Sequence, residues 1–271
     1  MFVFVSGIGG IGNTLFQLAT AIYYCETYNY DLIITQNRAT LFGTSNLFGK
    51  TNCLNVNNEF VTYDKTIFSK IKFIKSIDGN YITVHNNYTN DLIVPTNENI
   101  LISGYNQNIS LFSSVMNKIP KYLHLDDINI KKSIFEKYPN IANSTIICVR
   151  IGDDFRHMTK ITQDSYLKAI DHLKQNGETI NDVFVISDVN TNKFFNNLMI
   201  NYAEINEPDI IQFYAGLLCK NLILSESTFH LWIAYLASDF GKNTDKKVIC
   251  FNNTDITNRN LNVENWITLD Y

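Results

Sequence analysis

The second half of the sequence alternates short apolar runs with amphipathic segments, and this alternation constrains the fold more than any other feature. Apolar runs of strand length lie at 144–149, 182–187, 221–225 and 247–251. Segments with a helical spacing of apolar residues lie at 164–175, 190–199, 209–218 and 229–237. Short strands that alternate with helices are typical of a parallel, doubly wound sheet. We therefore predict a parallel α/β lobe here, with the strand 247–251 as its last.

The first half opens with a strand, a glycine-rich loop and a helix. Residues 2–6 are β-rich, apolar residues recur at helical spacing from Thr14, and residues 31–35 form a second apolar run. A strand–helix–strand unit of this kind is almost always right-handed in a parallel sheet. Residues 100–103 are a further short strand, whereas the Asn-rich stretch 37–99 has no readable topology.

A domain boundary is expected near Pro139. A charged stretch with helical character runs from Lys121 to Tyr138, and Pro139-Asn140 ends it. The chain has 271 residues, of which 45% are hydrophobic, so it is long enough for two cores. We predict an α/β fold of two Rossmann-like lobes, residues 1–140 and 141–271, with a cleft between them.

Charge and hydropathy exclude two classes of partner. The net charge is -4, and the Lys and Arg residues are spread out, which disfavours nucleic acid. No apolar run is long enough for a membrane span. The apolar start of the sequence, MFVFVS, is too short for a secretory signal and lacks its basic residues. We therefore expect a cytoplasmic protein.

Cysteine and histidine patterns argue against a metal or a disulfide framework. The five cysteines are odd in number, far apart and free of C-x-x-C pairs, as expected of reduced thiols. The five histidines lack H-x-x-x-H spacing. We therefore expect no metal and no cofactor.

The glycine-rich loop has three interpretations. Gly7-x-Gly9-x-x-Gly12 follows a strand and opens a helix, the context of a dinucleotide-binding loop. A dinucleotide site also needs an acidic residue near the end of the second strand, but Thr35-Gln36-Asn37-Arg38 has none. Only Arg38 would suit the 2′-phosphate of NADP(H). The alternatives are a tight turn without a ligand and a loop for another phosphorylated donor, which the polar groups of Asn13 and Gln17 favour.

Three segments resemble a known family in the same order along the chain. Gly9–Gln17, GGIGNTLFQ, resembles the GGxGNQxFQ start of the α-1,2-fucosyltransferase family, glycosyltransferase family 11. Cys148–Asp153, CVRIGD, resembles that family's H-x-R-R-x-D peptide, and its Arg-Ile-Gly core also resembles protein O-fucosyltransferases. Ser225–Trp232, SESTFHLW, is similar to the family's N-S-T-F-S-W-W. Two shorter elements agree: GYNQ at 104–107 with G-Y-x-Q, and VISD at 185–188 with F-S-D.

The resemblance implies a GT-B-like enzyme that transfers L-fucose from GDP-fucose to a glycan hydroxyl with inversion and without a metal. It implies that Arg150 holds the β-phosphate of the donor. The glycine loop with Gly10, Gly12 and Asn13 would face donor and acceptor. A loop at a helix start would close on the pyrophosphate, formed by Ser227, Thr228 and Phe229.

The chemistry of these residues allows other roles. Arg150 follows an apolar strand, at the edge where open α/β sheets bind ligands, but it would also pair with Asp153 or Asp154. Ser227 and Thr228 precede a helix and would serve as its N-cap. Asp188 would either touch the nucleoside or cap a helix.

The general base must be a carboxylate or a histidine. The candidates are Asp153, Asp154, His157, Glu226 and His230. Asp153 occupies the family's Asp position, where it would act as the base or anchor the loop.

Several motif positions depart from the family. Its His is Cys148 here, its second Arg is Ile151, its Asn is Glu226, and the Ser after Phe229 is His230. Two hypotheses follow: a transferase of fucose or a related deoxyhexose, and a glycan- or nucleotide-binding relative without catalysis. The glycine loop and Arg38 leave an NADP(H) oxidoreductase as the third.

Overall fold

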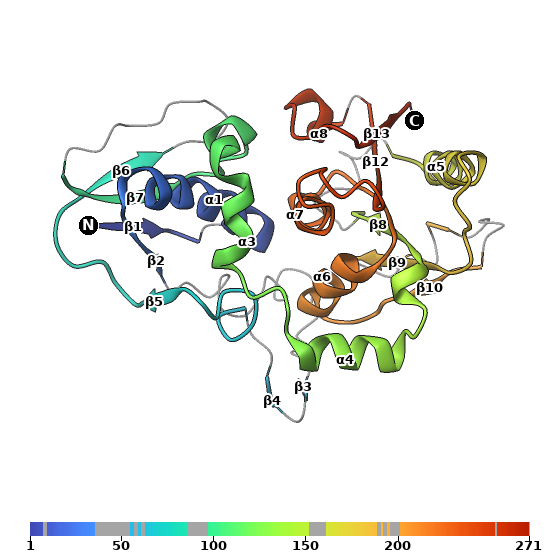
Figure 1. Cartoon of the computed structure of the whole chain (residues 1–271), viewed down its shortest axis with the longest axis horizontal. Coiled ribbons are helices and arrows are strands. Elements are labelled where there is room, and N and C mark those ends of the chain that lie inside the picture. The colour runs from blue at the N-terminus through green and yellow to red at the C-terminus, as the bar shows by residue number, and fades with distance from the viewer. Residues whose placement is uncertain are drawn as a thin grey trace. The chain divides into compact units, whose positions relative to one another are not determined.

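A computed structural model describes most of the chain, and the chain divides into two compact units. The described residues are 1–7, 10–35, 55–56, 59–60, 63–85, 97–151, 161–188, 191, 194–195, 201–252 and 254–270. Unit 1 is Met1–Asp127 and unit 2 is Ile128–Tyr271 (Figure 1). Each unit is built on its own parallel sheet.

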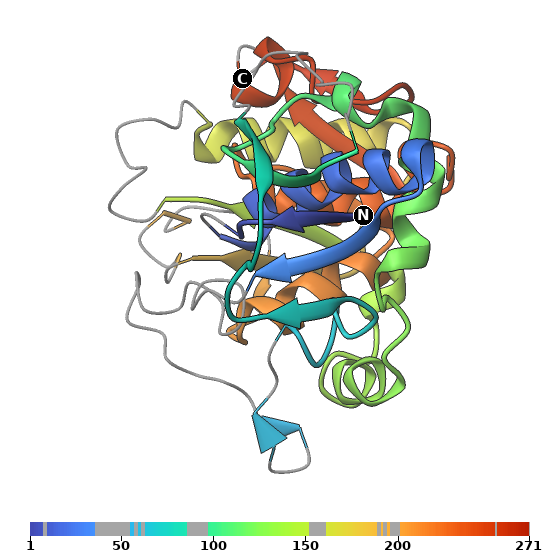
Figure 2. The same ribbon diagram turned by 90° about the vertical axis from the view of Figure 1, so that its left-hand side faces the viewer.

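Unit 1 has five parallel strands in the order β5-β2-β1-β7-β6. Figure 2 shows β1, β2 and β5 as arrows that point the same way. These strands are β1 (Phe2–Val5), β2 (Asp31–Thr35), β5 (Lys72–Ile74), β6 (Tyr81–His85) and β7 (Asn99–Ser103). A separate antiparallel pair consists of β3 (Asn55–Val56) and β4 (Glu59–Phe60). The predicted strands 2–6, 31–35 and 100–103 are confirmed.

The first helix, α1 (Ile11–Tyr28), connects β1 to β2. It begins before Thr14 because Gly10, at its N-cap, has an extended backbone, and the chain turns helical directly after it. Its apolar stripe, which includes Leu15, Leu18 and Ile22, is fully buried. Asn29 ends the helix in the left-handed conformation and donates its backbone N–H to Cys25 O.

The predicted charged helix 121–138 is wrong as one element. The chain instead forms a run of short helices, η2 (Ile109–Leu111), η3 (Ser113–Lys118), α3 (Ile119–Tyr122) and, after a break, α4 (Ile128–Lys137). In the break, the backbone N–H of His124 donates to Ile67 O at 2.9 Å, a tertiary bond that no local signal predicts. Helix α4 packs against α6 (Asp209–Leu218), so the units divide at 127/128 rather than at 140/141.

Unit 2 has six parallel strands in the order β10-β9-β8-β11-β12-β13. The strands are β8 (Thr145–Val149), β9 (Val183–Ser187), β10 (Ala203–Glu204), β11 (Asn221–Ile223), β12 (Lys247–Phe251) and β13 (Ile267–Leu269). Besides α6, the connecting helices are η4 (Ile141–Asn143), α5 (Gln163–Gln175), α7 (Thr228–Ala237) and α8 (Asp255–Asn258). The predicted alternation is confirmed, except that β12 is followed by β13. Most of the predicted helix 190–199 lies outside the described residues.

The strand order of unit 2 defines a ligand-binding edge. β8 is the first strand of the unit in chain order, yet it lies in the middle of the sheet. β9 and β10 continue to one side of it, and β11, β12 and β13 continue to the other. The order therefore reverses between β8 and β11. Open α/β sheets bind ligands at this point, beyond the carboxyl ends of the strands.

The two parallel sheets with their helices confirm the predicted α/β class with Rossmann-like units. In unit 2 the helices α6 and α7 approach closely, since a Cβ on Gly216 would lie 2.4 Å from Ile233 Cγ2. Trp232 and Tyr235 of α7 are fully buried, as core residues are. Among the helices that are described, none combines the length and the apolarity needed to cross a membrane.

Candidate functional site

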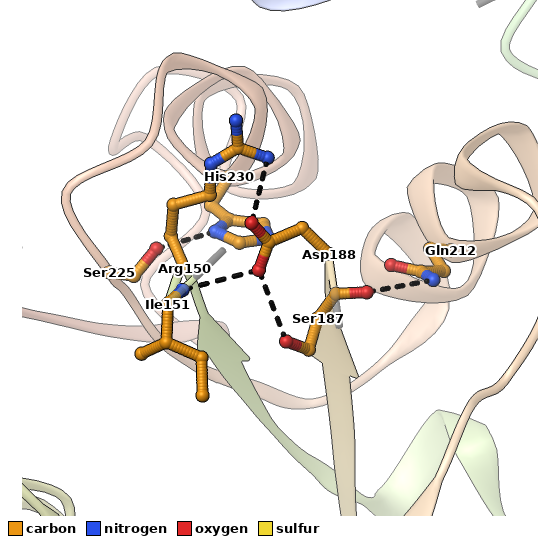
Figure 3. A network of polar contacts seen from close by, with 7 residues as sticks. All are labelled: Arg150, Ile151, Ser187, Asp188, Gln212, Ser225 and His230. Carbon is orange, nitrogen blue, oxygen red and sulfur yellow. Dashed lines mark hydrogen bonds and ion pairs between the residues drawn. The ribbon is translucent and has the colours of Figure 1, made fainter. Parts of the chain in front are cut away.

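The carboxyl edge of the unit 2 sheet carries an ion pair between two strand ends. Val149 is paired with Ser187 in the register of β8 and β9, so the next residues, Arg150 and Asp188, are neighbours. Arg150 Nη1 lies 3.2 Å from Asp188 Oδ2, and the two side chains are 22% and 6% exposed (Figure 3). Arg150 is thus at the edge that the sequence predicts, but its described carboxylate partner is Asp188.

The second oxygen of the Asp188 carboxylate binds the backbone. Oδ1 accepts a hydrogen bond from the Ile151 N–H at 3.2 Å and another from Ser187 Oγ at 3.4 Å. On α6, the Gln212 side chain donates to Ser187 O at 3.4 Å and to Glu207 O at 2.8 Å. The end of β9 is therefore fixed by hydrogen bonds from the end of β8, through Ile151, and from α6, through Gln212. The sequence pattern singles out neither Gln212 nor the pairing of Asp188 with Arg150.

The loop after β11 approaches the same edge from the other side. Its Ser225 Oγ lies 2.6 Å from His230 Nδ1, and both residues are buried (Figure 3). Ser227 is at the N-cap position of α7, but its side chain makes no capping hydrogen bond. A capping role for the Ser227 hydroxyl is therefore wrong. Helix α7 begins at Thr228 and Phe229, and the positive end of its dipole lies at this edge.

The burial of His230 argues against it as the general base. Burial, together with the positive charge of Arg150, lowers the pKa of His230 from 6.5 to about 3. The ring is 3% exposed and stays neutral at physiological pH. A base with a pKa so far below the working pH has little driving force to take a proton from a hydroxyl. His230 therefore supports the loop through Ser225.

The lowered pKa of His230 predicts a specific loss of stability in mild acid. The unfolded chain takes up a proton below about pH 6.5, whereas folded His230 stays neutral down to about pH 3. The free energy of unfolding therefore falls by about 1.4 kcal/mol for each pH unit below about 6.5. Between pH 7 and pH 5 we expect the wild type to lose about 2 kcal/mol more than His230→Gln. Urea unfolding of both proteins at each pH measures the difference, and parallel pH slopes would contradict the prediction.

Other predicted residues lie in the core or outside the described part of the chain. Cys148 is fully buried in β8, and burial raises the pKa of its thiol. Its side chain lies in the core instead of at the ligand edge. Glu226 is half-buried in the loop before α7. The candidates Asp153, Asp154 and His157, with Gly9 and Arg38, lie outside the described residues.

In unit 1, the glycine loop follows β1 and a second loop follows the neighbouring strand β7. Gly7 has a φ of 63°, which a residue with a side chain rarely adopts. Gly10 is the N-cap of α1, and Gly12 is buried in its first turn. Asn13 Oδ1 accepts a hydrogen bond from Gln107 Nε2 at 2.9 Å, which links the first turn of α1 to the loop after β7.

Gln17 has a structural role instead of the ligand contact that its polar side chain suggests. It is fully buried, and its Oε1 accepts from the Gly7 N–H at 2.9 Å and from Ser6 Oγ at 3.1 Å. Its Nε2 donates to Gly104 O at 2.9 Å. One amide group thus joins the ends of β1 and β7. Within the described ranges, no three His, Cys, Asp or Glu side chains gather as metal ligands would.

Comparisons with known proteins find a similarity in structure but none in sequence. No protein-family model matches the sequence, and no curated protein matches it. A mutant of Arabidopsis thaliana FUT1 in complex with GDP matches with a TM-score of 0.52 and 13% identity, over 91% of this chain and 69% of that chain. NodZ α-1,6-fucosyltransferase soaked with GDP-fucose matches with a TM-score of 0.52 and 14% identity, over 88% and 93%. The fucosyltransferase NodZ from Bradyrhizobium matches with a TM-score of 0.51 and 14% identity, over 87% of this chain and 94% of that chain. The chain therefore has the fold of these fucosyltransferases.

Proposed function

We propose that the protein is a glycosyltransferase that moves L-fucose, or a related deoxyhexose, from its GDP-sugar to a glycan hydroxyl. Transfer is by inverting displacement without a metal ion. Unit 2 binds the nucleotide sugar, and unit 1 serves the acceptor side. The motif resemblance favours an α-1,2 linkage, whereas one structural neighbour is an α-1,6-fucosyltransferase.

The observation that carries the proposal is the position of Arg150. It lies at the carboxyl end of β8, where the strand order reverses, and α7 begins after the neighbouring strand β11. A guanidinium beside a helix N-terminus is suited to a phosphate group. The structural neighbours include a complex with GDP and an enzyme soaked with GDP-fucose, which agrees with a nucleoside diphosphate ligand.

The chemistry follows from the charge of the leaving group. When the glycosidic bond of the donor breaks, negative charge develops on the departing diphosphate. Arg150 and the first amides of α7, at Thr228 and Phe229, would stabilise that charge by hydrogen bonds. The N-cap residue Ser227 instead donates its own N–H to Ser225 O and would shape the loop. The glycine loop, with Gly10, Gly12 and Asn13, would face donor and acceptor. Asp153 is the proposed base for the acceptor hydroxyl, with Glu226 as the second candidate.

A binding protein without catalysis is the second candidate function. The fully buried Cys148 and the weakly basic His230 favour it, because neither side chain is suited to the reacting atoms. Ile151 also stands where the resembling family has its second Arg. This candidate predicts binding of the nucleotide sugar without turnover.

Ligand-induced stabilisation tests the donor class. The melting temperature is measured with GDP, UDP, dTDP, CMP, GDP-fucose and NADPH, each with Mg²⁺ and with EDTA. A ligand that binds only the folded state adds about 2.7 kcal/mol at about a hundred times its dissociation constant. We expect GDP and GDP-fucose to raise the melting temperature equally with Mg²⁺ and with EDTA. A shift with NADPH alone would contradict the proposal and favour the oxidoreductase.

Turnover separates the two candidate functions. The release of GDP from GDP-fucose is followed with a panel of glycan acceptors, and the product linkage and anomeric configuration are determined by NMR. Transfer with inversion supports the transferase. Tight binding of GDP-fucose without release of GDP across the panel supports the binding protein.

A further inference from the structure

We infer that Asp188 is a positioning residue, which orients Arg150 for the diphosphate of the donor and does not contact the nucleoside. This inference rests on the proposed function. It assigns a role to a carboxylate that would otherwise only weaken an anion site, because its negative charge opposes that of the ligand.

The topology separates Asp188 from the ligand crevice. Asp188 follows β9, which lies on one side of β8, and β11 lies on the other side. The strand order reverses between β8 and β11, so the crevice is on the side of Arg150 that is away from β9. Asp188 therefore contacts Arg150 from the side that faces away from the crevice.

The two oxygens of Asp188 fix both the side chain and the backbone of the same strand end. Oδ2 lies 3.2 Å from Arg150 Nη1, and Oδ1 accepts from the Ile151 N–H at 3.2 Å (Figure 3). The Asp188 side chain is 6% exposed, so solvent and salt screen this pair less than a surface pair. Through Ser187, the bond from Gln212 anchors the strand end that carries Asp188.

A held guanidinium is more useful for phosphate binding than a mobile one. The group is planar and has five N–H donors in a fixed fork, so one contact at Nη1 sets the direction of the others. Fixing this long side chain before the ligand arrives removes an entropy cost from binding. His230, on the crevice side, is neutral, so it does not repel the guanidinium of Arg150.

The variant Asp188→Asn tests the inference because it keeps the shape of the side chain but replaces one of its two acceptor oxygens by an NH₂ donor. An amide has one oxygen, so in either orientation its NH₂ group faces a donor, Arg150 Nη1 or the Ile151 N–H. We expect the dissociation constant for GDP to rise about tenfold, which corresponds to about 1.4 kcal/mol. The matched control is Asp171→Asn, an exposed carboxylate of α5 paired with Lys174, which we expect to bind GDP as the wild type does.

A double-mutant cycle distinguishes positioning from direct contact. If Asp188 acts through Arg150, Asp188→Asn has no further effect on GDP binding in an Arg150→Gln background. NMR titration, which reaches millimolar constants, measures all four proteins. An equal loss in both backgrounds would mean that Asp188 contacts the ligand itself, and would overturn the inference. Unchanged or tighter GDP binding by Asp188→Asn would also overturn it.

A readout without ligand separates this inference from the proposed function. The chain has only four arginines, Arg38, Arg150, Arg156 and Arg259, so side-chain NMR signals can be assigned by substitution. We expect the rotation of the Arg150 guanidinium to be slow in the wild type and in Asp171→Asn, and fast in Asp188→Asn. Wild-type protein that shows this restriction but binds no GDP would contradict the proposed function alone. A guanidinium that rotates freely in the wild type would overturn the inference.

Discussion

Replacement of Arg150 by alanine is expected to lower kcat/KM for sugar transfer from the GDP-sugar about a hundred- to thousandfold. The side chain is at the strand end where the sheet order reverses, and it is the charge proposed to stabilise the departing diphosphate. Charge-assisted contacts to a phosphate strengthen as charge develops on the leaving group, so kcat falls together with kcat/KM. Initial rates of GDP release at several donor concentrations give both constants.

Two further variants make the Arg150 result specific. Arg150→Lys keeps the charge and loses the planar fork, so we expect it to retain part of the activity. Lys132→Ala removes a positive charge from an exposed position on α4 and is expected to transfer at the wild-type rate. An Arg150→Ala protein with a wild-type circular dichroism spectrum and full transfer activity would rule out the assigned role.

Replacement of Gln17 by leucine is expected to lower the free energy of unfolding of unit 1 by about 3 kcal/mol. Leucine fills most of the space but removes the amide oxygen that the Gly7 N–H binds, and it leaves the Gly104 carbonyl with only its 3.2 Å hydrogen bond from Asn106 Nδ2. Each buried orphan group costs about 1–3 kcal/mol. Urea unfolding followed by far-UV circular dichroism measures the loss, and hydrogen exchange of the β1 and β7 peptides locates it.

Thr20→Val is the matched control for Gln17→Leu. Thr20 is also fully buried on α1, and its hydroxyl donates to Phe16 O at 3.1 Å, within the same helix. That carbonyl keeps its helical partner after the substitution, so we expect a loss below about 1 kcal/mol. Similar losses in the two variants would argue against the special role of Gln17. Both tryptophans, Trp232 and Trp266, lie in unit 2, so their fluorescence follows the other unit.

The sequence predicted the fold well where a local pattern carries the information. The strand residues 145–149, 183–187 and 247–251 are apolar and almost wholly buried, and amphipathic helices separate them, so periodicity alone locates them. The edge strands β10 and β13 have only two and three residues, none of them buried, so they lack the buried apolar run that reveals the equally short β11.

Breaks that depend on tertiary contacts were not predictable in this way. The segment between α3 and α4 has no Gly or Pro to mark its end, and its hydrogen bond from His124 reaches Ile67, far away in the sequence. The helical prediction across 121–138 therefore fails at this point.

The candidate site was predicted in part. A charged residue directly after an apolar strand marks the ligand edge of a parallel sheet, and this signal finds Arg150. The contact between Arg150 and Asp188 depends on the register of β8 and β9, which a single strand does not encode. An alignment of the two strand ends, each followed by a charged residue, would have suggested it. The roles of Gln17 and Gln212 depend on backbone carbonyls and amides of distant loops, which have no sequence signal.

The central position of β1 and of β8 has a consequence for the order in which the chain folds during synthesis. β1 pairs with β2 soon after both are made, but its other neighbour, β7, begins only at Asn99. Likewise β8 receives its second neighbour when β11 is complete at Ile223. Until then β1 and β8, which are inner strands in the finished sheets, are edge strands with one unpaired side. An unpaired strand edge is a template for pairing between chains. Fragments that end before β7 or before β11 keep this edge unpaired, and we expect them to aggregate.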